Sequence, residues 1–162
     1  EQLPADVVIL ATGWKQPLDF LSPDLQHAVR PGLHFRLFRR ILPPSVPGLG
    51  FIGYASSIAC QLNSEIAAHW LSEHFLGRLS LPSVAEMETE VDRVQRWTDN
   101  ALPGRSDGFF IGGYLIQYID ELLDDMRLPR RRLRNPLREF FGCLTPERWR
   151  DVSVERRQRH KN

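Results

Sequence analysis

Several features that define common protein classes are scarce or absent in this 162-residue sequence. Its two cysteines, Cys60 and Cys143, lie far apart and outside any CxxC or Cys/His cluster, so neither a zinc site nor a disulfide framework is expected. Reduced, packed thiols are the default, and no metal site is expected. No apolar run approaches the length of a membrane span, and the start lacks a basic secretory leader. These absences favour a cytoplasmic protein without a membrane span.

An excess of one charge is also lacking, because 21 Lys and Arg residues offset 20 Asp and Glu residues to give a net charge of +1. The apolar fraction of 42% and the charged fraction of 25% are those of a globular domain. The charge is nevertheless uneven, because arginine far outnumbers the acidic residues from Arg127 onward. The basic character belongs to the C-terminal segment, which mixes turns with a short amphipathic piece and then becomes a run of charged residues.

Three apolar stretches predict strands in the first third of the chain. Residues 6–11 form a nearly continuous aliphatic run, typical of a strand covered on both faces. Residues 33–38 alternate apolar and polar side chains, which is typical of a half-buried strand. A proline-rich loop follows, and residues 50–54 predict a short third strand.

Helical patterns follow these strands. The first predicted helix begins at Asn63 or Ser64 as its N-cap and stops at Gly77. The second opens with the capping box Ser83-x-x-Glu86. Both carry apolar residues at three- and four-residue spacing, so each should bury one face.

A third helix is predicted over residues 114–126, where Leu115, Ile119, Leu122 and Met126 share one stripe. Strands followed by helices do not make a complete doubly wound sheet, in which strand and helix alternate throughout. The pattern predicts either a terminal part of an α/β protein, with few strands and mostly helices, or a small α+β domain with a poor sheet.

One apparent cofactor motif is rejected on its context. Residues 48–53, "GLGFIG", spell the dinucleotide fingerprint GxGxxG, which requires a preceding strand and a following helix. Here the glycines follow "LPPSVP", which cannot be a strand. We interpret them as a turn followed by a strand. The Gly-rich residues 108–114 are a bend before a helix and lack a P-loop lysine.

Three segments, in order, resemble the flavin-containing monooxygenases and the related Baeyer-Villiger monooxygenases. Residues 5–14, "ADVVILATGW", are similar to the family's "VVxATGY" segment, which ends the last strand of the NADP-binding domain. Residues 37–77 are similar to its passage of proline-rich loop, "FIG" strand and helix with Glu and Trp before Gly. Residues 112–126, "GGYLIQYIDELLDDM", resemble its "YxDxLxxDMG" segment. The resemblance covers roughly residues 4–128.

The resemblance implies the C-terminal portion of a flavoprotein with two dinucleotide-binding domains, Rossmann-like folds for FAD and NAD(P). Residues 1–14 would be the last strand of the NADP-binding domain and a hinge, residues 15–128 the C-terminal part of the FAD-binding domain, and residues 129–162 a basic tail. The family's two true GxGxxG fingerprints lie upstream of the ATG segment, and none occurs here. We therefore expect that upstream dinucleotide-binding domains are missing and that this segment alone is inactive.

The resemblance also implies an activity. In the family, NADPH reduces FAD, O2 gives a C4a-(hydro)peroxyflavin, and one oxygen atom passes to a nucleophilic nitrogen or sulfur or to a carbonyl carbon of a small-molecule substrate. Neither the substrate nor any catalytic residue is readable from this sequence.

The residues expected to bind the cofactor lie at the ATG segment and around the start of the first long helix. There, free amides and the positive end of a helix dipole would stabilise a reduced flavin. Ser56, Ser57 and Asn63 also fit as helix caps, and Gly13 as a strand-ending turn. The full set is Thr12, Gly13, Tyr54, Ala55, Ser56, Ser57, Gln61, Leu62 and Asn63.

Two alternatives stay open. A binding or adaptor domain could use the basic tail, with Arg130, Arg131 and Arg132, to bind nucleic acid or another anion. The tail lacks interleaved stacking aromatics, so no nucleic-acid partner is expected. A second alternative is another flavoprotein with two dinucleotide-binding domains, such as a disulfide reductase, although the proline-rich loop and "YIDELLDDM" fit monooxygenases better.

Other polar and aromatic residues receive structural interpretations. His69 and His74 are five residues apart on one helix, which is the wrong spacing for a shared metal, so we expect surface or packed side chains. Trp70 and Trp97 are expected in the core or at an interface. The acidic residues of the third helix are expected to form a solvated face, namely Asp120, Glu121, Asp124 and Asp125.

Overall fold

The computed structural model describes residues 17–101, 111–133 and 145–160, together with the single positions 6, 7, 9, 135, 137 and 142. Helices dominate this part of the chain, as the sequence predicts. The elements in chain order are α1 (Pro23–Val29), α2 (Cys60–Phe75), α3 (Val84–Ala101), the 3-10 turn η1 (Gly112–Tyr114), α4 (Leu115–Asp125), the 3-10 turn η2 (Pro146–Trp149) and α6 (Val152–Arg159).

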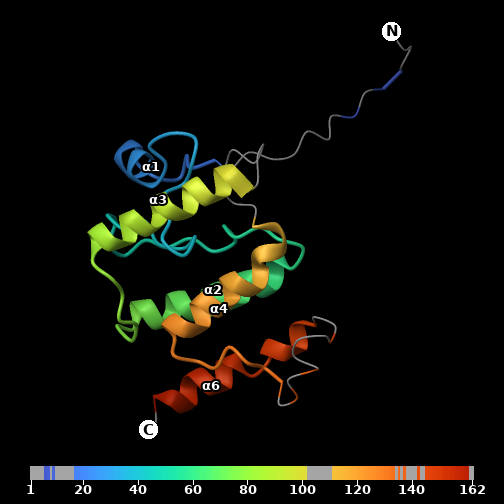
Figure 1. The fold of residues 1–162 in the computed structure, drawn as a ribbon. Coiled ribbons are helices and arrows are strands. Elements are labelled where there is room, and N and C mark those ends of the chain that lie inside the picture. Colours follow the sequence, from blue (N-terminus) through green and yellow to red (C-terminus); the bar gives the residue numbers. More distant parts are fainter. Residues whose placement is uncertain are drawn as a thin grey trace.

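The helices are arranged around a central pair. Figure 1 shows α2 and α4 side by side, with the irregular segment between α1 and α2 separating them from α3, and with α6 on the opposite side. The apolar stripe predicted for the third helix is confirmed, because its four residues are all buried against α2. Trp70 of α2 is fully buried in the same core. The α2–α4 pair is therefore the centre of the hydrophobic core.

The two strands predicted at residues 33–38 and 50–54 are wrong. These segments are irregular, and an isolated backbone bridge joins Phe38 to Leu42. Single bonds replace a ladder: Arg36 N donates to Val29 O, and Phe51 N donates to Ile41 O, both at 2.8 Å. The alternation reported burial in part, since Phe35, Leu37 and Phe51 are buried but Leu33 is 76% exposed, and a strand also needs a neighbouring strand to pair with. The predicted strand at 6–11 lies largely outside the described residues.

The capping signals at the start of α3 and at the end of α2 are confirmed. Ser83 and Glu86 form the predicted capping box, in which Glu86 N donates to Ser83 Oγ at 3.4 Å and Ser83 N donates to Glu86 Oε2 at 2.8 Å. Gly77 follows the end of α2 with φ +67°, and its N–H donates to His74 O. Helix α1 was not predicted, although Ser22 and Pro23 carry its N-terminal signal.

Rejection of the glycine fingerprint agrees with the structure. Gly48 and Gly53 have φ of +79° and +94° and lie in turns, and no helix begins until Cys60. A Cβ added to Gly50 would lie 2.6 Å from Leu71 Cδ1, so this glycine allows the backbone to approach α2 closely. The strand expected after the turn is absent, as described above.

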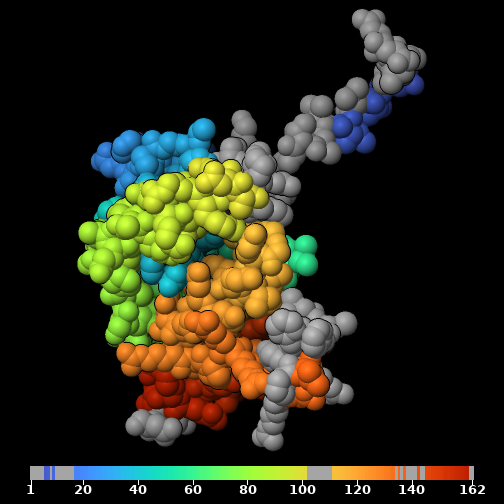
Figure 2. All heavy atoms as spheres, in the orientation of Figure 1, coloured from blue at the N-terminus to red at the C-terminus, as the bar shows by residue number. Residues whose placement is uncertain are grey.

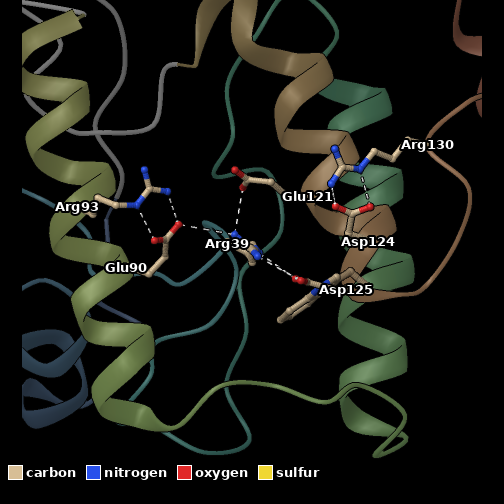
Figure 3. A network of polar contacts seen from close by, with 8 residues as sticks. Arg39, Glu90, Arg93, Glu121, Asp124, Asp125 and Arg130 are labelled. Atoms are coloured by element: carbon tan, nitrogen blue, oxygen red, sulfur yellow. Dashed lines mark hydrogen bonds and ion pairs between the residues drawn. The ribbon is translucent and has the colours of Figure 1, made fainter.

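The prediction of a solvated acidic face on α4 is only partly right. The side chains of Glu121 and Asp124 are 45% and 41% exposed, but that of Asp125 is only 19% exposed, and two arginines contact these acidic residues (Figure 3). Arg39 donates to Asp125 Oδ2 at 2.8 Å and to Glu121 at 3.2 Å, and it lies 3.8 Å from Glu90 of α3. Burial disfavours its charge, but the bond to Asp125 and the charges of the three carboxylates outweigh burial and raise the pKa of Arg39.

The C-terminal segment also departs from the sequence prediction. Where a run of charged residues was expected, η2 and α6 form, and Trp149 and Val152 are buried in the main core. Two buried apolar side chains thus attach this segment to the rest of the chain, which the charge pattern concealed.

Replacing Ser83 by Ala tests the capping box. We expect Ser83→Ala to lower the free energy of unfolding by about 1 kcal/mol, because the cap bonds at the start of α3 are lost. The bonds from Ser83 hold the pKa of the Glu86 carboxyl below its usual value. The part of the stabilisation that comes from the bond between Ser83 Oγ and the Glu86 carboxylate is therefore present at neutral pH and is lost as the pH falls through about 4 toward the folded-state pKa. Urea unfolding of both proteins across this pH range checks the prediction. A loss independent of pH would contradict it.

The arginine network provides a matched pair of variants. Arg39→Met should lower the free energy of unfolding by about 3 kcal/mol, because partly buried carboxylates lose their shared cation. Arg93→Met removes an exposed arginine that binds Glu90 at 2.6 Å and should cost less than about 0.5 kcal/mol. Chemical unfolding measures both. Equal losses of unfolding free energy in the two variants would show that burial of the arginine does not determine how much it stabilises the fold.

Candidate functional site

The N-terminal end of α2 carries most of the residues expected to contact a cofactor. The helix begins at Cys60, with Ala59 as an N-cap that makes no side-chain capping bond. The prediction of Asn63 or Ser64 as the N-cap is therefore wrong. The first intrahelical donation is from Asn63 N to Ala59 O at 3.1 Å, so the amides of residues 60–62 have no carbonyl partner within the helix. This end of α2 presents donors and the positive end of a helix dipole.

Asn63 is buried beneath this turn and ties it together. Its amide Nδ2 donates to Ala55 O at 2.9 Å and to Ser57 Oγ at 2.8 Å, and only 2% of the residue is exposed. Ser57 Oγ also accepts a bond from Ala59 N at 3.1 Å. The side chain predicted as a cap thus bonds to the preceding loop instead, because burial of that loop leaves Ala55 O in need of a donor.

The other amide atom of Asn63 has a different environment. Its Oδ1 is buried and receives no hydrogen bond from the described residues. The two contacts of Nδ2 with oxygen atoms determine the amide orientation, since reversing it would bring Oδ1 against the Ala55 carbonyl. Most buried acceptors in proteins are satisfied. Asn63 Oδ1 is thus an unsatisfied acceptor held in one orientation. Such an atom is suited to accept a hydrogen bond from an N–H group of a bound ligand.

Cys60 is a further member of this turn that the sequence did not identify. The residue is exposed, which contradicts the expectation of a packed thiol. Its Sγ donates to Ser57 O at 2.7 Å and accepts from Ser57 N at 3.4 Å, so the thiol fixes the loop against the helix start. The sequence feature that could have identified Cys60 as part of this turn is its four-residue spacing from Ser56. Cys143 lies outside the described residues.

The remaining predicted residues do not all converge on this turn. Tyr54 packs against Phe35 and Phe51, with ring centroids 5.0 and 5.1 Å apart, in a separate apolar cluster. Leu62 is buried in the main core, and Gln61 is exposed. Ser56 is half-buried, and its carbonyl accepts a bond from Ile111 N at 2.8 Å. Thr12 and Gly13 lie outside the described residues.

A second feature is a hollow between α3 and α4, visible on the face shown in Figure 2. It encloses about 230 Å³ and is lined by Arg40, Trp97, Tyr114 and Gln117, among others. Trp97 and Tyr114 meet edge to face at 4.5 Å, in agreement with the packing expected for Trp97. Burial lowers the pKa of Arg40. The hollow contains none of the predicted cofactor residues, so we place the candidate site at the start of α2.

The two histidines of α2 are packed, as predicted. His69 and His74 are half-buried, burial lowers the pKa of both, and His74 stacks on Trp70 at 6.0 Å. Within the described ranges, no group of three or more His, Cys, Asp or Glu side chains could hold a metal ion. Nor is any helix in these ranges both long and apolar enough to span a bilayer.

Comparison with known proteins assigns the class. The family model described as flavin-binding monooxygenase-like matches residues 1–152. The chain therefore belongs to the flavin-binding monooxygenase-like family, as its three motifs predicted. No solved structure matches it significantly.

Individual relatives agree with this assignment. "Probable flavin-containing monooxygenase 1" of Arabidopsis thaliana is 33% identical over 151 residues, which cover 86% of this chain and 27% of the relative. "FAD-dependent monooxygenase DEP4" of Fusarium langsethiae is 33% identical over 135 residues, covering 78% of this chain and 23% of the relative. "Flavin-containing monooxygenase 3" of Canis lupus familiaris is 26% identical over 161 residues, covering 91% and 29%. The chain spans about a quarter of the length of these relatives.

The role of Asn63 in the turn is testable by an amide-to-acid change. Asn63→Asp should lower the free energy of unfolding by about 3 kcal/mol, because both donations are lost and a carboxylate faces the Ala55 carbonyl. Gln61→Glu makes the same chemical change two residues earlier, at an exposed position, and should cost less than about 0.5 kcal/mol. Urea unfolding compares the two variants. Similar losses would contradict a special role for the Asn63 amide.

Proposed function

We propose that this chain acts as the C-terminal part of an FAD- and NADPH-dependent monooxygenase, with the start of α2 facing the flavin. The bound flavin would activate O2 and transfer one oxygen atom to a nitrogen, a sulfur or a carbonyl carbon of a small-molecule substrate. NADPH would reduce the flavin. Family membership supports the class, and the unsatisfied Oδ1 of Asn63 is the observation that supports the site.

The residues of the turn fit the polar edge of a flavin ring. A flavin ring carries an N–H donor beside two carbonyl oxygens. Asn63 Oδ1 would accept from the ring N–H, while the open amides at the start of α2 would donate to a carbonyl oxygen. The dipole of this 16-residue helix would stabilise negative charge on the reduced ring. These residues orient the ring, and the chemistry belongs to the cofactor.

The division of the chain into domain segments, which the sequence predicts, is also part of this proposal. Residues 1–14 would leave the NADP-binding domain and residues 15–128 would complete the FAD-binding domain, while dinucleotide fingerprints would come from sequence outside this chain. The length of the relatives supports this division, since the chain corresponds to about a quarter of them.

The alternative of an anion-binding tail receives less support. Arg130 pairs with Asp124, and Arg132 donates to Glu155 Oε2 at 2.9 Å. The Arg132 side chain is only 3% exposed. Both guanidinium groups already contact acidic groups of the same chain, and the burial of Arg132 leaves it poorly placed to contact phosphates.

Flavin retention tests the proposal. A chimera would join this chain to the upstream dinucleotide-binding part of the Arabidopsis thaliana relative. We expect the chimera to purify yellow and oxidise NADPH, and the 162-residue chain alone to retain no flavin. Asn63→Asp in the chimera should lower flavin affinity by about tenfold, because loss of the Nδ2 bonds to Ala55 O and Ser57 Oγ releases the side chain from the orientation in which Oδ1 faces the ring N–H.

The same chimera carrying Gln61→Glu is the control and should keep its flavin. Circular dichroism of each variant separates lost binding from lost folding. Stoichiometric flavin with NADPH oxidation on the isolated chain would contradict the segmentation. Equal flavin affinity of folded Asn63→Asp and Gln61→Glu chimeras would contradict the proposed site.

A further inference from the structure

A buried carboxylate lies in the last turns of α2. The side chain of Glu73 is only 1% exposed and faces three arginines and one histidine. Arg78, from the turn that follows α2, lies 3.7 Å away. The other three belong to the C-terminal segment: Arg156 at 3.4 Å, Arg159 at 3.7 Å and His160 at 2.5 Å. A buried carboxylate without partners is strongly unfavourable, so these contacts carry the burial of Glu73.

The same arginines bond to backbone carbonyls in and after the central helices. Arg156 Nη1 donates to His69 O inside α2 at 2.9 Å, and Arg159 donates to Met126 O at the C-cap of α4 and to Arg78 O beyond the end of α2. The C-terminal end of a helix carries partial negative charge. The basic last turn of α6 therefore meets the carboxylate of Glu73 and the negative end of α4 in one place.

Apolar contacts alone hold α6 only weakly on the core. Trp149 and Val152 are its buried apolar anchors, and most other side chains of the helix are half-buried or exposed. An eight-residue helix is marginal without tertiary contacts. The family match ends at residue 152, where α6 begins, so three of the four partners of Glu73 lie beyond the matched residues.

We propose that α6 is an electrostatic strap across the ends of α2 and α4, and that the carboxylate of Glu73 determines whether the strap is docked. With Glu73 charged, the cations of α6 are compensated and the helix stays on the core. Without that charge, the guanidinium groups of Arg156 and Arg159 are desolvated without an acid partner, so α6 leaves the core. This inference does not rest on the proposed function.

Hydrogen exchange in the 162-residue chain tests the strap. Glu73→Gln keeps the shape of the side chain and removes its charge. We expect amide exchange of residues 152–159 to accelerate by about tenfold or more, with little change in α3. Glu65→Gln makes the same change at an exposed position of α2 and should leave exchange of α6 within about twofold.

A second variant changes the arginines of α6 instead of Glu73 and therefore leaves α2 unaltered. Replacing Arg156 and Arg159 together by Met should accelerate exchange of α6 to a similar extent. Adding Glu73→Gln to this variant should produce no further acceleration, because both changes remove one interaction.

Two results would overturn the proposal. One is exchange of α6 that stays within about twofold in both Glu73→Gln and the double Met variant. The other is equal acceleration of α6, α2 and α3 in the double Met variant, since the arginines would then stabilise the whole chain rather than the docking of α6.

Discussion

The arrangement of the helices depends on the partly buried guanidinium group of Arg39. It lies between α3 and α4 and contacts Asp125, Glu121 and Glu90. Asp125 Oδ2 also accepts a bond from Trp70 Nε1 at 2.9 Å, which brings α2 into the same network. Arg39 has φ +52° and its neighbour Arg40 has φ +54°, in a region that non-glycine residues seldom occupy. In this conformation Arg39 forms ion pairs with α3 and α4, and the bond from Trp70 to Asp125 joins α2 to them.

Helix α2 places a buried polar group near each of its ends, and the two groups differ. Asn63 near the N-terminal end has an acceptor that no described residue satisfies, whereas Glu73 near the C-terminal end is surrounded by three arginines and one histidine. An open acceptor suits a ligand that is supplied from outside the chain. An over-compensated carboxylate suits an intramolecular contact. The same helix thus combines the features of a ligand platform and of a docking surface for the C-terminal segment.

Local signals in the sequence predicted local structure well. The capping box at Ser83, the stop at Gly77 and the apolar stripe of α4 all depend on residues close in sequence, and all three are confirmed. The strands at residues 33–38 and 50–54 were wrong because alternation reports burial, while a strand also requires a neighbour that pairs with it. The cap at Asn63 was wrong because the loop at Ala55 competes for the same side chain.

By itself, the sequence determined the helical character of the chain, its family and the segment that carries the candidate site. These properties follow from short-range periodicity, from capping residues and from the order of three motifs. Only the tertiary structure decided which polar groups meet. Arg39 reaches Asp125 over 86 residues, and His160 reaches Glu73 over 87 residues. No local pattern encodes such pairings, because they arise when packing of the apolar core brings distant helices into contact.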